Sequence, residues 1–284
     1  MVGDIPPDIA PSKPPKLEQV AACPLCDSSN VMLAPQQPDP PFGLMQCAAC
    51  GGIFLSPRPR IDAMPAYYDD YYGGEQPEEP SARQIRRSRR HFKRLARHAR
   101  PGRLLEVGAG DGYFLHAAKE AGWTVEGLEL STPRVERAKK WFGLNLSPQD
   151  LFSANLQPRT YDAMAMFQLI EHVHDPRGII RKSHELLKPG GLLMMSTPNV
   201  LAYARKNRDV NSWRIPRHLF FFSPRTLVRT VEKAGFTVLR RGLKFHAAVE
   251  ERLGWHPWQT SSLLGGAARD LWTPFGLHVI ARKK

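Results

Sequence analysis

The chain has 284 residues, which is long enough for a principal domain with a smaller annex. Hydrophobic residues make up 42% of the chain and charged residues 24%, proportions that are typical of a globular protein and exclude a wholly disordered one. The net charge of +13 is compatible with anionic partners, whether nucleic acid, phosphorylated metabolites or a lipid surface.

Residues 1–21 contain five prolines and few large apolar side chains. Such a segment cannot bury enough surface to offset the entropy lost on ordering, so we expect it to be disordered. It shows no basic-then-apolar signal pattern, and no apolar run in the chain approaches the roughly 18 residues of a transmembrane segment. We therefore expect a cytoplasmic protein.

The four cysteines form two pairs, Cys23-x-x-Cys26 and Cys47-x-x-Cys50, with 20 residues between the pairs. This spacing is typical of a zinc ribbon, in which two tight turns present four thiolates to one tetrahedral ion. Disulfides are the alternative, and they are disfavoured in a chain without a secretion signal. We predict a zinc ribbon over residues 22–56 with a structural Zn²⁺, followed by a linker over residues 57–80.

The main domain is predicted over residues 81–284 and opens with an amphipathic helix. Ile85, Phe92 and Leu95 share one helical stripe, and Arg and Lys occupy most of the remaining surface. Strand-like and helix-like segments then alternate, which predicts an α/β fold with a parallel sheet and helices on both faces. The predicted strands are RLLEV, TVEGLEL, YDAMAMF and GLLMMST, and the predicted helices cover about 113–121, 132–142, 177–187 and the segment from Pro224. The stretch 198–222 has no clear period, so we predict a functional loop or lid there.

A glycine turn, Gly108-x-Gly110-x-Gly112, separates the first of these strands from its helix. The dinucleotide fingerprint has its third glycine one residue later, and a bare structural turn is the alternative reading. Glu106 would repel a pyrophosphate and instead favours a ligand that carries a cation. Glu129 follows the second strand, where an acid can accept hydrogen bonds from both ribose hydroxyls. Together these residues predict one nucleoside pocket.

The heptapeptide Glu106–Gly112, with LIEHVHDP and LKPGG downstream, resembles the motifs of class I S-adenosylmethionine-dependent methyltransferases. The resemblance implies a Rossmann-like class I methyltransferase sheet and S-adenosylmethionine as the methyl donor. It also implies donor-binding roles for Asp150, against the adenine amine, and for Gln168. The run from CPLC through CAACGGIFLSPRP to YYDDYY resembles bacterial methyltransferases with an N-terminal zinc-binding module, including relatives of sugar C-methyltransferases.

Methyl transfer is an in-line displacement, which needs the acceptor to be aligned with the methyl group and, for some acceptors, a proton to be removed. Three residues are candidates for these roles. Glu171 and His172 follow the fourth strand and are expected near the donor methyl, or alternatively they hold the strand-to-helix turn. His218 lies in RIPRHLFFFS and is either a base or a loop histidine bonded to backbone. Related O-methyltransferases bind a metal through an E-x-x-E-H pattern, whose first acid is Gln168 here. The tyrosines of the linker are predicted to pack against the main domain; they are Tyr67, Tyr68, Tyr71 and Tyr72.

The predicted function is methyl transfer from S-adenosylmethionine to a small-molecule acceptor of the sugar, lipid or secondary-metabolite type, anionic acceptors included. Two alternatives stay open. One is an RNA methyltransferase that uses the basic helix and the zinc module as an electrostatic platform. The other is a protein that binds the donor without catalysis. The sequence leaves the identity of the acceptor and the oligomeric state open.

Overall fold

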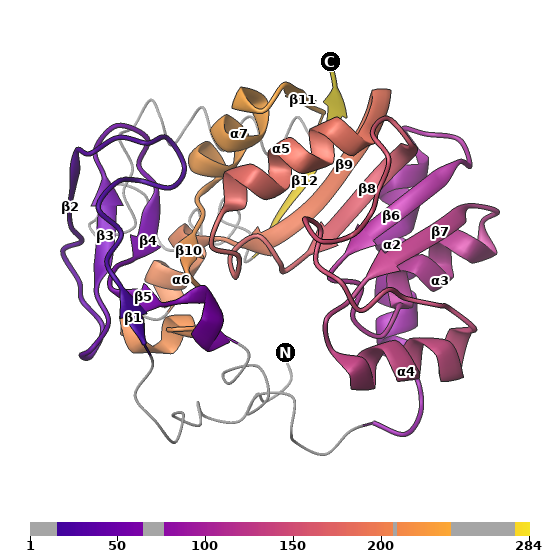
Figure 1. Cartoon of the computed structure of the whole chain (residues 1–284), viewed down its shortest axis with the longest axis horizontal. Helices are drawn as coiled ribbons and strands as arrows, with labels where there is room; N and C mark the ends of the chain where they lie inside the picture. The colour runs from indigo at the N-terminus through magenta and orange to yellow at the C-terminus, as the bar shows by residue number, and fades with distance from the viewer. Residues whose placement is uncertain (1–15, 65–76, 207–208, 240–275) are drawn as a thin grey trace.

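The computed structural model describes residues 16–64, 77–206, 209–239 and 276–284. Within these residues the chain forms a large six-stranded sheet, a small four-stranded sheet and a two-stranded ribbon (Figure 1). The large sheet carries helices on both faces, and the small sheet lies beside it. No helix in the described part of the chain is long and apolar enough to cross a membrane.

The large sheet has the strand order β11-β12-β9-β8-β6-β7. Its strands are β6 (Arg103–Val107), β7 (Thr124–Leu128), β8 (Tyr161–Phe167), β9 (Leu187–Pro198), β11 (Phe236–Val238) and β12 (Gly276–Lys283). β7, β6, β8 and β9 are parallel, whereas β12 pairs antiparallel with β9 and β11 antiparallel with β12. The predicted α/β fold is confirmed, with two antiparallel strands added at one edge.

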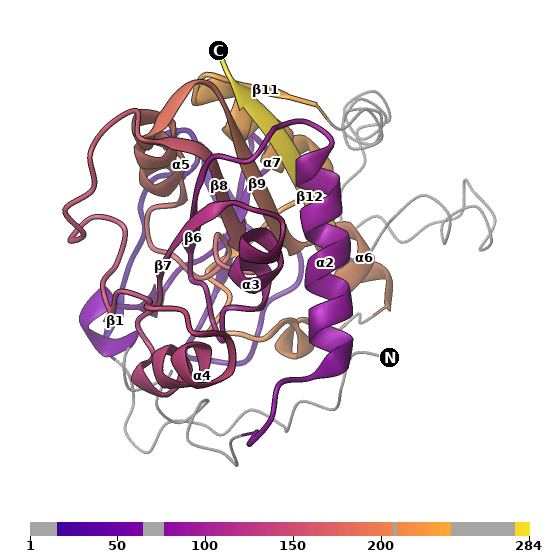
Figure 2. The ribbon, with the colours of Figure 1, turned by 90° about the vertical axis from the view of Figure 1, so that its right-hand side faces the viewer.

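Successive residues of each strand point to opposite faces of the sheet, which gives the domain two apolar layers. Leu104 packs with Phe92 in the layer under α2 and α3, whereas Leu105 lies in the layer with Ile180 of α5 and Leu227 of α7. Figure 2 shows α2 and α3 together on one side of the sheet, with α5 on the other. The helices are α2 (Ala82–Ala96), α3 (Tyr113–Glu120), α4 (Thr132–Phe142), α5 (Pro176–Leu186), α6 (Val200–Lys206) and α7 (Pro224–Lys233), with 3₁₀ turns η1 (Ile61–Ala63) and η2 (Val210–Trp213).

The small sheet combines two distant parts of the chain. Its strands are β2 (Val31–Leu33), β3 (Leu44–Cys47), β4 (Ile53–Leu55) and β10 (Phe220–Phe221), in the order β10-β4-β3-β2. All neighbours are antiparallel. Its apolar side chains are continuous with the core under α5 and α7. We call the part built from residues 22–56 the four-cysteine module.

Two sequence predictions are corrected by the structure. The expectation that residues 1–21 are disordered is wrong for β1 (Leu17–Glu18), because this strand pairs with β5 (Arg58–Pro59) and Glu18 forms a 2.7 Å ion pair with Arg58. The stretch 198–222 is more regular than expected, since it contains α6, η2 and β10. The Asn199 side chain starts α6 by accepting a hydrogen bond from the Leu201 amide at 3.1 Å.

Two predicted segments fall outside the described residues, and one predicted helix is confirmed. Residues 1–15 and the four linker tyrosines lie outside the described part of the chain. The helix after Ser223 forms as predicted, and Ser223 and Thr226 build a reciprocal capping box at its start.

Candidate active site

The glycine turn lies at the carboxyl end of β6 and leads directly into α3. Gly108, Gly110 and Gly112 have φ values of +68°, +56° and +79°, a region that side chains rarely adopt. A Cβ on Gly112 would lie 2.7 Å from the Leu144 side chain and 3.2 Å from Ala138 Cβ, so a larger residue would displace its neighbours and strain the backbone. The turn therefore lies at the edge of the sheet where ligands bind in this architecture.

Glu129 is held against this turn by two hydrogen bonds. Its Oε2 accepts from the Gly110 amide at 2.7 Å, and its Oε1 accepts from the Ser131 amide at 2.9 Å. Each carboxylate oxygen keeps a further lone pair for an outside donor. The arrangement places an acid with acceptor capacity next to the glycines, as the ribose-binding prediction requires.

Glu106 is a buried acid beside the same turn, with 3% of its surface exposed. Its Oε2 has no hydrogen-bond partner among the described residues. Burial, followed by repulsion from Glu129, raises the pKa of Glu106 well above its ordinary value. A cationic donor group would satisfy the oxygen and offset both effects, whereas a phosphate would add repulsion. This donor set fits S-adenosylmethionine, which carries an ammonium and a sulfonium.

Asp150 and Gln168 lie further along this edge of the sheet. The Asp150 carboxylate accepts from the Phe152 amide at 2.7 Å and from the Ser153 hydroxyl at 2.8 Å, so it caps its own turn. Gln168 has φ +51° and its side-chain amide donates to the Ser196 hydroxyl at 3.2 Å. Their direct contact with the donor stays a prediction.

Glu171, His172 and His218 converge in one cluster, although the last is far from the others in sequence. One ligating atom from each lies within 4.8 Å of the others. The two imidazole rings are edge to face with centroids 4.8 Å apart, and His172 Nε2 lies 4.0 Å from Glu171 Oε1. His172 Nδ1 donates to the Arg217 carbonyl at 2.8 Å, which leaves Nε2 as the acceptor nitrogen of the neutral ring.

Burial controls the protonation of this cluster. It raises the pKa of Glu171 to about 8, lowers the pKa of His172 to about 4 and lowers the pKa of His218 well below 6.5. Neither Glu171 oxygen has a hydrogen bond of ordinary geometry among the described residues, although the Thr197 hydroxyl partly opposes the rise in its pKa. At neutral pH the two imidazoles are therefore uncharged and able to accept a proton.

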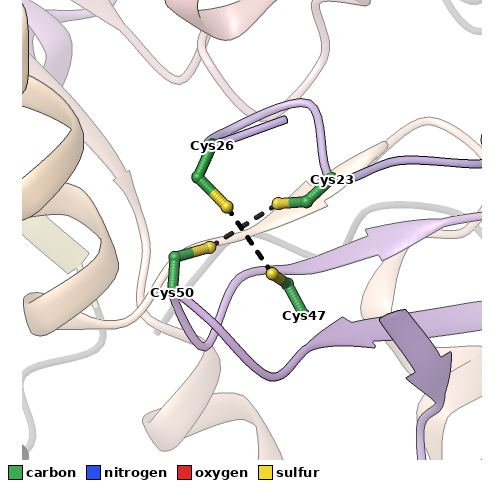
Figure 3. A group of neighbouring side chains, drawn as sticks. All are labelled: Cys23, Cys26, Cys47 and Cys50. Carbon is green, nitrogen blue, oxygen red and sulfur yellow. Dashed lines mark hydrogen bonds between the residues drawn. The ribbon is translucent and has the colours of Figure 1, made fainter. Parts of the chain in front are cut away.

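The four cysteines converge at the second cluster (Figure 3). Cys23 Sγ lies 3.5 Å from Cys50 Sγ, and Cys26 Sγ lies 3.6 Å from Cys47 Sγ. A disulfide would require about 2.05 Å, whereas sulfurs at the corners of a zinc tetrahedron are about 3.8 Å apart for Zn–S bonds of about 2.3 Å. The hydrogen bond between Cys23 and Cys50 lowers the pKa of Cys50 and raises the pKa of Cys23, so the pair shares one proton that a metal cation would displace. The donor set fits Zn²⁺.

An ion pair that the sequence analysis missed stabilises the glycine turn. Asp111, inside the turn, pairs with Arg137 of α4 at 2.8 Å, and both side chains are mostly buried. The two residues are separated in sequence by α3 and β7, so no local pattern predicts their contact. The pair fixes the turn to the helix that follows Glu129.

The fold is Rossmann-like, and the comparisons identify the chain as an S-adenosylmethionine-dependent methyltransferase. A family model described as "Methyltransferase domain" matches residues 81–241, and the chain belongs to this family. Among curated relatives, a ubiquinone biosynthesis O-methyltransferase of Xanthomonas campestris is 39% identical over 114 residues, which are 37% of this chain and 46% of the relative. One of the same name from Idiomarina loihiensis is 31% identical over 117 residues, covering 39% and 45% of the two chains. The chain thus spans about half the length of these relatives.

Solved structures agree on the fold. An S-adenosylmethionine-dependent methyltransferase from Mesorhizobium loti superimposes with a TM-score of 0.51 at 20% identity, covering 70% of this chain and all of that one (100%). The PH0226 protein from Pyrococcus horikoshii gives a TM-score of 0.54 at 13% identity, covering 76% of this chain and 98% of that one. At these identities the likeness concerns the fold alone.

Replacement of Glu129 by alanine is expected to weaken the binding of S-adenosylmethionine by roughly 1.5–3 kcal/mol, the range for hydrogen bonds to a charged group. Calorimetric titration of wild type and variant measures the difference. Glu136→Ala is the matched control, because Glu136 is exposed on α4 and should leave the affinity unchanged. Equal affinities of wild type and Glu129→Ala would remove Glu129 from the site.

Proposed function

We propose that the protein transfers a methyl group from S-adenosylmethionine to a small-molecule acceptor, with His218 as general base. The observation that carries this proposal is the convergence of Glu171, His172 and His218 after β8. Buried ionisable side chains without a charge partner are costly, and they concentrate at catalytic sites. No strong ion pair within the described residues accounts for the Glu171 carboxyl.

The residues at the carboxyl ends of β6, β7 and β8 would hold S-adenosylmethionine. When bound, this donor supplies an electrophilic methyl group. Glu106 would bind its ammonium and Glu129 its ribose hydroxyls. The glycine turn would let the backbone approach the donor closely. Asp150 and Gln168 are proposed as further contacts to the donor. The protein's own contribution is to align the acceptor for in-line attack and to accept the proton that the acceptor loses.

His218 is available as a base because burial keeps its imidazole neutral at physiological pH, and the same lowered pKa makes it a weaker base than a free imidazole. His172 is fixed by its bond to the Arg217 carbonyl and packs edge to face against the His218 ring, which restricts the orientation of that ring. The names of the two curated relatives specify O-methylation, which favours an acceptor hydroxyl here. A hydroxyl must lose its proton during transfer, so such an acceptor would need the base.

A second candidate function, methylation of RNA, draws on one feature of α2. Five arginines form an exposed stripe on this helix, opposite the buried Phe92 and Leu95; they are Arg83, Arg86, Arg87, Arg90 and Arg94. Such a stripe attracts phosphate backbones. The described surface offers no matching row of aromatic side chains for base stacking, so the small-molecule acceptor is preferred.

We further propose that Cys23, Cys26, Cys47 and Cys50 bind one structural Zn²⁺. The near-tetrahedral sulfur spacing supports this assignment, and four protein ligands leave no open position for catalysis. The division into a zinc ribbon at 22–56, a linker at 57–80 and a methyltransferase domain at 81–284 belongs to the same proposal, with β10 as the strand that the domain contributes to the ribbon's sheet.

Incubation with S-adenosylmethionine labelled in its methyl group tests the function. The protein is supplied with separate cell fractions of small metabolites, lipids, saccharides and RNA. We expect label in a small-molecule, saccharide or lipid fraction, and about tenfold to a hundredfold less label with Glu129→Ala at limiting donor. Label confined to RNA would overturn the preferred acceptor class. Tight donor binding with no label in any fraction would favour a binding protein without catalysis.

A further inference from the structure

The four-cysteine module and the His218 cluster are connected by a short chain of backbone contacts. It begins at the metal ligands themselves. The Cys47 amide donates to the Gly52 carbonyl at 2.9 Å, and the Gly52 amide donates to Cys50 Sγ at 3.4 Å. β4 starts at the next residue, Ile53. The position of β4 is therefore fixed at one end by the second cysteine pair.

β4 in turn holds the segment that follows His218. The Leu55 amide donates to the Leu219 carbonyl at 2.9 Å, and Phe54 pairs with Phe220 in the antiparallel register. The Phe54 and Phe220 rings are also neighbours, with centroids 6.5 Å apart. β10 is only two residues long, and such a strand has no stability without its partner.

The opposite side of this segment contacts Glu171 and His172. The Glu171 carbonyl accepts hydrogen bonds from the Leu219 amide at 2.7 Å and the Phe220 amide at 3.1 Å. His172 Nδ1 bonds to the Arg217 carbonyl at 2.8 Å. His218 thus lies between two residues that are tied to the other members of the cluster, and the segment 217–220 is clamped between that cluster and β4.

We propose that the metal-bound four-cysteine module positions His218 through β4 and β10. The proposal rests on the proposed function for the catalytic role of His218, but the coupling itself concerns only the backbone. Metal loss removes the cross-link that fixes the Cys47–Cys50 turn, and small zinc modules lose their fold without metal. β4 would then release Leu219 and Phe220, and the imidazole of His218 would lose its fixed orientation.

A separate contact between the module and the main domain provides the control. Arg177 of α5 forms a two-pronged ion pair with Asp27, both bonds at 2.5 Å, on the first cysteine turn. This contact does not involve β4 or β10. If attachment of the module to the main domain were enough to explain the effect, loss of the Arg177–Asp27 ion pair would have the same effect as loss of the metal.

The test compares the full-length protein loaded with Zn²⁺ with the same protein after treatment with a chelator under reducing conditions. We expect amide hydrogen exchange of Leu219 and Phe220 to accelerate about tenfold or more after metal removal, while amides of β6 and β8 stay protected. S-adenosylmethionine affinity should stay unchanged, because the donor residues lie on the main sheet. The kcat for methyl transfer should fall about 10²-fold, the effect of a small misplacement of a catalytic group.

Two variants sharpen the comparison. Phe54→Leu removes the ring contact with Phe220 but keeps all four cysteines, and it should lower kcat and raise exchange at Phe220 with zinc retained. Arg177→Gln should leave kcat, exchange and zinc content unchanged. Unchanged protection of Leu219 and Phe220 after metal loss would overturn the coupling. A parallel loss of donor affinity would also overturn it, since it would indicate general unfolding. Faster exchange combined with full activity of His218→Ala would support the coupling and refute the proposed base.

Discussion

Replacement of His218 by alanine is expected to slow methyl transfer by about 10²–10⁴-fold, the usual contribution of a general base. The fold and the affinity for S-adenosylmethionine should be preserved, because His218 lies outside the glycine turn and its neighbouring acids. Single-turnover rates with a saturating donor, measured once an acceptor is known, separate the chemical step from binding. In the wild type, the loss of kcat at low pH should begin below pH 6.5, because burial lowers the pKa of His218.

His172→Ala is the comparison for this experiment, since it removes the same kind of side chain from the same cluster. Its Nδ1 is committed to the Arg217 carbonyl, so we expect it to act by orienting the segment rather than by proton transfer. A wild-type rate for His218→Ala would refute histidine catalysis there. Alignment of the acceptor alone would then be the better account, because the raised pKa of Glu171 keeps that carboxyl protonated near neutral pH.

Replacement of Glu171 by glutamine is expected to stabilise the protein, and more so as the pH rises. The pKa of Glu171 in the folded protein is raised to about 8 from an ordinary value of 4.5. Between these values the unfolded chain releases the proton and the folded chain retains it, so stability is lost as pH rises from 4.5 to 8. Glutamine has no charge to bury, and the variant should be more stable by about 3 kcal/mol at pH 7 and by about 1 kcal/mol at pH 5.

Urea unfolding of wild type and Glu171→Gln at several pH values between 5 and 8 measures this dependence. The signature is a stability difference that grows with pH, which a simple packing change would not produce. Glu126→Gln is a suitable control, because Glu126 is a partly exposed carboxylate that pairs with Arg103 at 2.5 Å. A difference that stays constant across this pH range would show that Glu171 ionises normally in the folded protein.

The sequence was sufficient to predict those parts of the fold and of the candidate site that depend on short-range patterns. The helix predicted at 132–142 coincides with α4, and the glycine turn and Glu129 lie together as their spacing indicates. These features follow from helical periodicity, from glycine's access to positive φ and from the rule that parallel strands end at one edge. Each depends on residues within one or two neighbouring elements.

The features that the sequence did not reveal depend on pairing between distant segments. Nothing in the two phenylalanines of β10 specifies β4 as their partner, and β12 has no local signal for its antiparallel place beside β9. The sequence likewise offered His218 and Glu171 as separate candidates, and only the folded chain shows their proximity. Long-range contacts of this kind are determined by the packing of the whole domain rather than by periodicity.

The contribution of β10 to the small sheet has a consequence for chimeras. The four-cysteine module is discontinuous in sequence, because one strand of its sheet comes from residues 220–221 of the methyltransferase part. A module grafted onto a related enzyme by joining the chains within the linker would lack this strand and expose the edge of β4. A working exchange would have to transplant the segment from Arg217 to Phe222 together with residues 22–56. The β4–β10 pair thus joins the module and the methyltransferase part into one structural unit, so neither part can be exchanged by cutting within the linker alone.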